Sequence, residues 1–193
     1  LVANRMENVL ALRGDPPKGE TRFVAHPDGF AYAKELVEFI RSRYSLCIGG
    51  AAYPEKHPEC PNADLDLDNL KRKVDAGADF LVTQLFFDNA DYFRFIDRCR
   101  KVGISVPIVP GIMPILSVPQ IKRITQMCGA RIPPTLVQRI EALQDNRVEV
   151  ERCGVDHATE QCRELLEQGA PGIHFYTLNR SKATWSIYGN LKG

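Results

Sequence analysis

The chain has 193 residues, 44% of them hydrophobic, and its 25 Lys and Arg residues nearly balance its 24 Asp and Glu residues. A chain of this size can bury a substantial core and falls within the range of one domain, which we place at residues 1–193. The near-neutral charge gives no electrostatic reason to expect a nucleic acid or an acidic membrane surface. No apolar run approaches the roughly 20 residues that a membrane span needs. We therefore expect a small-molecule partner, with no nucleic acid and no membrane.

Six cysteines are scattered along the chain without a C-x-x-C pair or a Cys and His spacing that would build a zinc site. We expect reduced thiols, no metal and a cytoplasmic location. The chain begins with Leu1 rather than Met, and residues 1–7 lack the apolar region of a signal peptide. We therefore expect further chain upstream.

The first part of the chain alternates twice between a short apolar run and a segment with helical spacing. A strand is expected over 8–12, followed by a helix over 30–44, where apolar side chains recur every four residues. A second strand is expected over 46–51, followed by a polar helix over 66–76. One of two aspartates is expected to cap this helix: Asp66 or Asp68.

The next part continues the alternation. A strand is expected over 80–87, because its unbroken apolar character suits a strand buried on both faces of a parallel sheet. A helix follows over 90–101, and another strand is expected over 107–112. Ser117 can cap the helix after that strand, and Gly129 can end it.

The last part holds more helix between residues 133 and 167 than one crossover needs, including an extra segment at 136–143. A final strand is expected over 172–178 and a final helix over 181–191. This alternation predicts an α/β protein, and five such units match the last five units of a (β/α)8 TIM barrel that lacks about three units at its front. The alternative is an open doubly wound sheet of flavodoxin type, although neither G-x-G-x-x-G nor a P-loop follows any strand.

Polar residues at the ends of barrel strands are the first functional candidates, because barrel active sites lie there. Asp15 follows the first strand and Gly14, and it either presents a carboxylate at the barrel mouth or caps a turn before Pro16. His57 lies in a proline-rich loop after the second strand; as an isolated residue it is more typical of an ordinary surface histidine. Gln84 places an amide in an apolar strand, and a buried amide needs a partner such as a ligand edge.

Further candidates lie beside these strand ends. Tyr53 can stack on a flat ring, and Arg180 can bind a carboxylate bidentately. Four polar side chains on neighbouring helical turns can hold ribose hydroxyls and a pyrophosphate, or can form only a solvated face: Asp66, Asn69, Arg72 and Lys73.

Six motifs follow one another along the chain: Leu-Arg-Gly-Asp, Ala-Ala-Tyr-Pro-Glu-x-His-Pro-Glu, Asp-Leu-x-Asn-Leu-Lys-Arg-Lys-Val-Asp-Ala-Gly-Ala, Thr-Gln-x-Phe-Phe, Pro-Gly-Ile-x-Pro and His-Phe-Tyr-Thr-Leu-Asn-Arg. In this order, and over nearly the whole chain, they resemble the 5,10-methylenetetrahydrofolate reductase family. The resemblance implies a (β/α)8 barrel that binds FAD and uses NADH or NADPH. It further implies that the flavin passes hydride to 5,10-methylenetetrahydrofolate, giving 5-methyltetrahydrofolate in one-carbon and methionine metabolism. We also expect a homo-oligomer.

The resemblance also implies roles for individual residues. Asp15 would be catalytic, because its charge can stabilise a cationic 5-iminium form of the folate. The substrate-binding residues would be Asp15, Gln84, Gln120, Ile124 and Arg180. The residues holding FAD would be Arg13, Gly14, Asp15, Tyr32, Ala33, Tyr53, His57, Asp66, Asn69, Arg72 and Lys73.

One family feature has no counterpart in this sequence. The family's catalytic acid is a glutamate in a Glu-Phe-Phe-Pro-Pro motif, so we expect this chain by itself to be impaired in turnover. One alternative is a non-catalytic folate- or FAD-binding barrel remnant that acts as a partner subunit. A barrel lyase or aldolase is another, although no Schiff-base lysine or group of metal-binding carboxylates lies at the strand ends.

Overall fold

The computed structural model describes residues 1–16, 19–20 and 23–192; residues 17–18, 21–22 and 193 lie outside the description. The strands are β1 (Asn8–Ala11), β2 (Cys47–Ala52), β3 (Phe80–Thr83), β4 (Ile108–Val109), β5 (Gly111–Ile112) and β6 (His174–Phe175). The helices are the short 3-10 helix η1 (Val2–Asn4), α1 (Ala33–Arg43), α2 (Ala63–Asp75), α3 (Asn89–Lys101), α4 (Val118–Cys128), α5 (Pro134–Glu141), α6 (Arg147–Glu167) and α7 (Lys182–Lys192).

All the paired strands of the described residues are parallel and follow one another in chain order. A four-stranded sheet has the order β1-β2-β3-β4, and a two-stranded sheet pairs β5 with β6. Only Pro110 separates β4 from β5, and its missing N–H interrupts the ladder. One continuous stretch of chain therefore pairs with β3 through its first half and with β6 through its second half.

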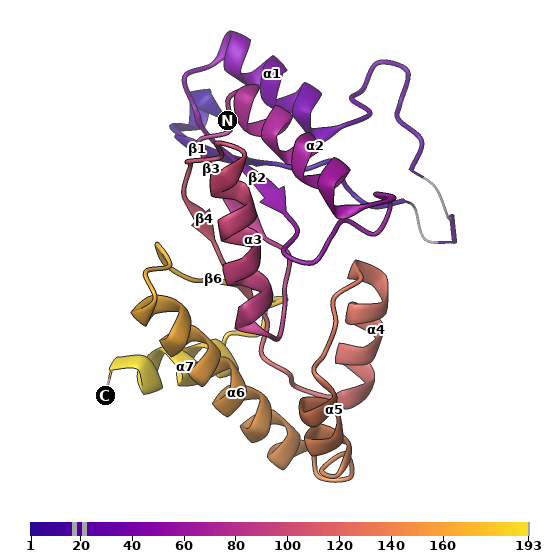
Figure 1. Cartoon of the computed structure of the whole chain (residues 1–193), viewed down its shortest axis with the longest axis vertical. Helices are drawn as coiled ribbons and strands as arrows, with labels where there is room; N and C mark the ends of the chain where they lie inside the picture. The colour runs from indigo at the N-terminus through magenta and orange to yellow at the C-terminus, as the bar shows by residue number, and fades with distance from the viewer. Residues whose placement is uncertain (17–18, 21–22, 193) are drawn as a thin grey trace.

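The crossover helices form a row beside the strands. Neighbouring helices touch in the sequence α1, α2, α3, α6 and α7, and Figure 1 shows α1, α2 and α3 on the same side of the strands. Helices α4 and α5 lie apart from α1 and α2, at the other end of the molecule in the same view. Chain-order strands with one layer of helices differ from a doubly wound sheet, which needs helices on both faces and a reversal of strand order.

The structure therefore confirms an α/β fold with a parallel sheet. Closure into an eight-stranded barrel, and the number of units, stay predictions. Among the described residues, no helix is both long and apolar enough to cross a bilayer. The six cysteines all lie among these residues and are free thiols.

Several local expectations are confirmed. The Ser117 hydroxyl accepts a hydrogen bond from the Gln120 amide at the start of α4, and Gly129 ends that helix with a φ of 74°. The extra helical segment expected at 136–143 is α5. The three residues after Phe80 in β3 are almost completely buried, as a strand covered on both faces should be.

The start of α2 differs from the expectation. The helix begins at Ala63, three residues before Asp66, and its N-terminal cap is Asn62, whose side chain accepts from the Leu65 amide at 2.9 Å. Neither Asp66 nor Asp68 is the cap. Instead, the Asp66 carboxylate accepts the backbone amide of His57 at 2.9 Å, so this side chain fastens the loop after β2.

The strand expected over 80–87 ends at Thr83. Leu85, Phe86 and Phe87 are apolar and buried, but they leave the sheet, and the Phe86 carbonyl accepts a hydrogen bond from the Gln161 side chain of α6 at 3.0 Å. A run of apolar residues cannot distinguish a buried strand from a buried connection whose backbone is satisfied by side chains. The strand expected over 172–178 is similarly reduced to β6, because the chain then enters a turn.

Helix α6 approaches the chain after β5 so closely that one helical position requires glycine. A Cβ built at Gly154 would lie 2.0 Å from the Ile115 carbonyl oxygen. At Gly189 in α7, by contrast, no heavy atom lies within 4 Å of such a Cβ. The two positions therefore form a matched pair.

We expect Gly154→Ala to lower the free energy of unfolding by about 2 kcal/mol or more, because the backbones of α6 and residue 115 must separate. Gly189→Ala should instead raise it by about 0.5–1 kcal/mol, because alanine favours a helix. Chemical denaturation of the two variants and the parent measures both effects. Equal stabilities for the two variants would contradict this packing.

Candidate functional site

Predicted functional side chains gather at the carboxyl ends of the strands in two groups. The first group, here called the β2-loop cluster, lies after β1 and β2 and on α2; it comprises Arg13, Tyr53, His57, Glu59, Asp66 and Lys73. The second group surrounds a pocket after β5 and β6. The first group follows strands of the four-stranded sheet, and the second follows the two-stranded sheet.

Arg13 and Asp15 lie where the chain leaves β1. The Arg13 guanidinium donates to both carboxylate oxygens of Glu59, at 2.8 and 2.5 Å, and covers the Phe23 ring with its carbon 4.7 Å from the ring centre. This fork raises the pKa of Arg13, mainly through the Glu59 hydrogen bond. Gly14 has a φ of 87°, and Asp15 beyond it is exposed and makes no hydrogen bond to another described residue. Its carboxylate is thus free to meet a ligand.

The loop after β2 holds Tyr53 against His57, with ring centres 4.5 Å apart in an edge-on arrangement. Burial is the main cause that raises the pKa of Tyr53, and the negative charges of Asp15 and Asp66 add to it. Burial also lowers the pKa of His57. Both rings therefore favour their neutral forms, in which each keeps a hydrogen to donate.

Lys73 is the most deeply placed cation of the β2-loop cluster. Its stem packs against Gly50, where a Cβ would lie 2.9 Å from the lysine Cδ. Its ammonium makes one hydrogen bond among the described residues, to the Ala51 carbonyl at 2.7 Å. Burial lowers the pKa of Lys73 to about 8, and Asp66 opposes this shift. Two of its three donors are left without a described partner, which suits an anionic ligand.

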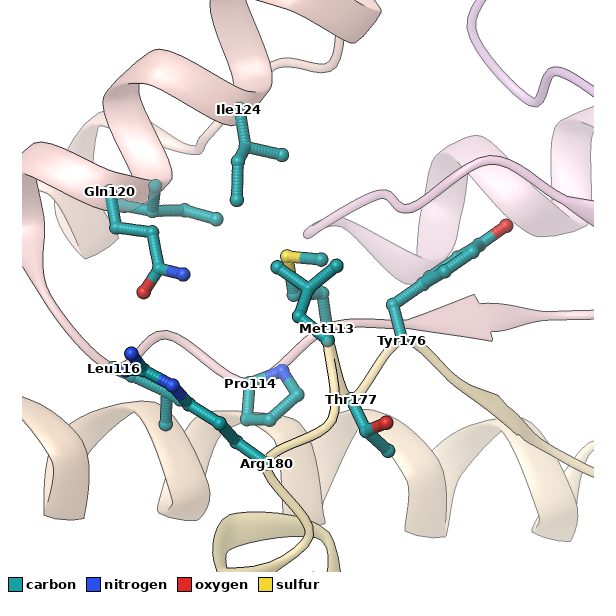
Figure 2. A pocket seen from close by; sticks show the side chains of 10 residues that line it. Met113, Pro114, Leu116, Gln120, Ile124, Tyr176, Thr177 and Arg180 are labelled. Atoms are coloured by element: carbon teal, nitrogen blue, oxygen red, sulfur yellow. The ribbon is translucent and has the colours of Figure 1, made fainter. Parts of the chain in front are cut away.

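The second group lines a partly open pocket between α4 and the two chain segments that leave β5 and β6. Gln120 and Ile124 come from α4, and Arg180 comes from the loop after β6. Figure 2 shows the Gln120 amide and the Arg180 guanidinium pointing toward one another across the pocket, with Ile124 on the Gln120 side. Its aliphatic floor includes Met113. The pocket thus combines an amide and a cation with an apolar wall.

Tyr176 forms another wall of this pocket, and the sequence alone did not indicate a role for it. Its hydroxyl donates to the Thr83 carbonyl at 2.7 Å, and its ring passes so close to Gly111 that a Cβ there would lie 2.6 Å from a ring carbon. Burial raises the pKa of Tyr176 to about 12, so this hydroxyl remains a donor. The sequence signal that could have pointed to Tyr176 was its place within the His-Phe-Tyr-Thr-Leu-Asn-Arg motif.

Gln84 lies beside a smaller pocket between the two groups. Its side-chain carbonyl accepts from the adjacent Leu85 amide at 2.9 Å. Tyr53 and Gln84 line the same shallow hollow, together with Cys128. This hollow connects the loop after β2 to the end of β3 and the end of α4.

Arg180 follows a turn with unusual backbone geometry. Leu178 and Asn179 have φ angles of 46° and 61°, and the Arg180 amide donates to the Thr177 carbonyl at 2.8 Å. Asparagine tolerates this left-handed region, whereas leucine adopts it at a steric cost. The turn places Leu178, which is 58% exposed, at the pocket.

Four other predicted FAD residues are not joined to the β2-loop cluster by hydrogen bonds between described residues. Tyr32 and Ala33 lie at the start of α1, where the Tyr32 amide donates to the Glu35 carboxylate. Asn69 and Arg72 are exposed on α2. No hydrogen bond between described residues therefore places these four side chains in the β2-loop cluster.

The fold, the β2-loop cluster and the pocket residues together define a class. This is an α/β protein whose candidate functional side chains lie at the carboxyl ends of parallel strands. The family model described as methylenetetrahydrofolate reductase matches residues 2–192. The chain therefore belongs to the methylenetetrahydrofolate reductase family, as the motifs had indicated.

Relatives from plants, yeast and bacteria agree with this assignment. The chain is 44% identical to methylenetetrahydrofolate reductase (NADH) 1 of Arabidopsis thaliana over 200 residues, which cover 98% of this chain and 34% of that protein. It is 40% identical to methylenetetrahydrofolate reductase 2 of Saccharomyces cerevisiae over 190 residues, which cover 96% and 32%. It is 41% identical to 5,10-methylenetetrahydrofolate reductase of Escherichia coli over 184 residues, which cover 95% and 60%. The chain thus spans about a third of the two eukaryotic relatives.

A solved structure shares the fold. An uncharacterized protein from Clostridium thermocellum, which binds two copies of 5-methyl-5,6,7,8-tetrahydrofolic acid, superposes with a TM-score of 0.54 at 19% identity. The match covers 92% of this chain and 65% of that one. At this identity the likeness concerns the fold alone.

The buried Lys73 should make the free protein less stable than a neutral variant. An unfolded lysine has a pKa of about 10.4, so between pH 8 and that value the folded state binds fewer protons than the unfolded state. The penalty is fully present at pH 7, and stability recovers as the pH rises through this window. We expect Lys73→Met to raise the free energy of unfolding at pH 7 by on the order of 1–2 kcal/mol and to flatten its rise above pH 8.

The control is Lys71→Met, since Lys71 lies two residues away on α2 and forms an i,i+4 ion pair with a half-exposed Asp75 carboxylate. It should change stability by less than about 0.5 kcal/mol. Denaturation of the ligand-free protein between pH 6 and 10 measures both variants. If Lys73→Met were less stable than the parent at pH 7, the ammonium of Lys73 would not lower the free energy of unfolding of the ligand-free protein.

Proposed function

We propose that the full-length protein reduces 5,10-methylenetetrahydrofolate to 5-methyltetrahydrofolate with NADH or NADPH and bound FAD. One observation beyond family membership supports this most strongly. Gln120, Ile124 and Arg180, for which the family resemblance implies a role in folate binding, come from two segments far apart in the sequence and line one pocket. A pocket with an amide, an apolar wall and a guanidinium suits an elongated ligand that carries a heterocycle and a carboxylate.

The β2-loop cluster fits FAD by its donor set. The two unpartnered donors of Lys73 suit a phosphate oxygen, and a bound anion would compensate the burial of the ammonium. Tyr53 and His57 offer neutral rings that can contact a flat ligand. When bound, FAD would accept hydride from the nicotinamide and deliver it to the folate's methylene carbon.

Asp15 and Gln84 would act on the folate. The Asp15 carboxylate is exposed beyond Gly14, where a fixed negative charge stabilises positive charge that develops on the folate during reduction. Gln84 carries both a donor and an acceptor beside the hollow shared with Tyr53, which suits the edge of a pterin. Arg180 would bind a carboxylate at the far end of the ligand.

The complete reaction consumes one proton as well as one hydride. The residues assigned in this chain do not include the glutamate that the family resemblance expects as the proton donor. The chain spans 60% of its Escherichia coli relative. We therefore propose the activity for the full-length protein, with these residues forming its folate pocket and part of its FAD site.

The direct test is to purify the full-length protein and measure oxidation of NADH and NADPH with the folate acceptor. We expect a yellow protein with bound flavin and folate-dependent turnover. A colourless protein that FAD cannot reconstitute would contradict the proposal. Binding of FAD and methyltetrahydrofolate without turnover would instead support the non-catalytic partner subunit.

Asp15→Asn should separate catalysis from cofactor binding. We expect folate reduction to slow by about 10²-fold or more, because the amide keeps the shape but removes the charge, while FAD affinity changes by less than about threefold. Stopped-flow measurement of flavin reoxidation by the folate gives the first quantity, and flavin fluorescence gives the second. Equal reoxidation rates for variant and parent would remove Asp15 from the mechanism.

Lys73→Met should lower FAD affinity by about 10-fold to 10²-fold, since it removes a charge-assisted contact to phosphate. Lys71→Met should leave the affinity unchanged, because its ammonium pairs with Asp75 on α2. In the parent, affinity should also fall as the pH rises above about 8, where the free Lys73 loses its proton. Titrations at pH 7 and 9 test both points, and an unaltered affinity in Lys73→Met would place the phosphates elsewhere.

A further inference from the structure

Lys56 closes a tight turn in the loop after β2. The Cys60 amide donates to the His57 carbonyl at 2.9 Å, which defines the turn. The Lys56 ammonium donates to the same His57 carbonyl at 3.1 Å and also to the Cys60 carbonyl. Lys56 is half-buried and makes these contacts to its own loop rather than to a carboxylate among the described residues. One side chain thus gathers two carbonyl oxygens that otherwise repel each other.

The closed turn orients the His57 ring. Within it, the Glu59 amide donates to His57 Nδ1 at 3.1 Å, so Nδ1 is an acceptor and the ring proton of the neutral form is on Nε2. The His57 amide is held separately by Asp66. The backbone and one ring nitrogen are therefore both engaged, and Nε2–H is the group left to donate to a ligand.

The same turn also presents Glu59 to Arg13. Their forked ion pair connects the loop after β2 to the end of β1, next to Asp15. The motif that contains this loop specifies His57 and Glu59 but leaves position 56 open.

We propose that Lys56 is a positioning residue that, by clamping the His57–Cys60 turn, fixes the Nε2–H tautomer of His57 and so prepares this ring to donate to the cofactor. The tautomer rests on the geometry of this chain alone, whereas its use in cofactor binding rests on the proposed function. The two parts are therefore tested by different measurements on the full-length protein.

The first measurement is the ¹⁵N spectrum of labelled histidine at a pH where His57 is neutral, with His57→Gln used to assign the signals. We expect the parent to show a protonated Nε2 and a bare Nδ1. Lys56→Met keeps the side-chain length but removes the ammonium, and it should shift these signals toward a mixture of tautomers. Lys56→Arg, which keeps the charge and the donors, should restore the parent pattern. Lys71→Met, which removes the ammonium of a lysine on the outer face of α2, should leave the spectrum unchanged.

The second measurement is FAD affinity. We expect the Kd to rise about tenfold in Lys56→Met and to stay within about twofold of the parent in Lys56→Arg and Lys71→Met. Lys56→Gln, which keeps a donor without the charge, serves as the second variant should the Met variant fail to fold.

An unchanged tautomer in Lys56→Met or Lys56→Gln would overturn the proposal. An altered tautomer with unchanged affinity would overturn its cofactor part, and failure of every version to bind FAD would count against the proposed function while the spectrum still decides the tautomer.

Discussion

Thr83, the last residue of β3, is joined by two hydrogen bonds to the start of β5 and to the residue that follows β6. Its hydroxyl accepts the Gly111 amide at 2.8 Å, and its carbonyl accepts the Tyr176 hydroxyl at 2.7 Å. The junction requires glycine at 111, because a Cβ there would lie 2.3 Å from the Thr83 carbonyl oxygen. Tyr176 lines the larger pocket, and Gln84, next to Thr83, lines the smaller one. These two hydrogen bonds therefore help to set the spacing between the two pockets.

Three members of the β2-loop cluster have surroundings that oppose charge. Burial lowers the pKa values of Lys73 and His57 and raises that of Tyr53, so each shift favours the neutral form. Among the described residues, Arg13 and Glu59 form a direct ion pair in this cluster. Such an environment strengthens hydrogen bonds to an anionic ligand, because little water competes with the ligand for the donors. Shifts of this kind concentrate at functional sites.

The sequence predicted the order and type of nearly every element, because apolar periodicity and caps such as Ser117 are local signals. It failed where hydrogen bonds between residues far apart in the chain determine the local structure. Asn62 caps α2 and leaves Asp66 to bind the His57 amide, and Gln161 satisfies the backbone of a segment that reads as strand. The family resemblance grouped Gln120, Ile124 and Arg180 as substrate-binding residues, and all three line one pocket, while their role stays a prediction. The motifs could not show the pairing of Arg13 with Glu59 or the role of Tyr176, since both depend on long-range packing.

Lys73 has a consequence beyond the site itself. A ligand that pairs with its buried ammonium binds only the folded state, so it adds stability in proportion to RT ln(1 + [L]/Kd), or about 2.7 kcal/mol at a hundredfold excess over Kd. In a cell, the fraction of unfolded chains open to proteases falls with that stability. The half-life and abundance of the protein would then follow the supply of its anionic ligand, which would make protein level a reporter of that supply without any dedicated regulatory site.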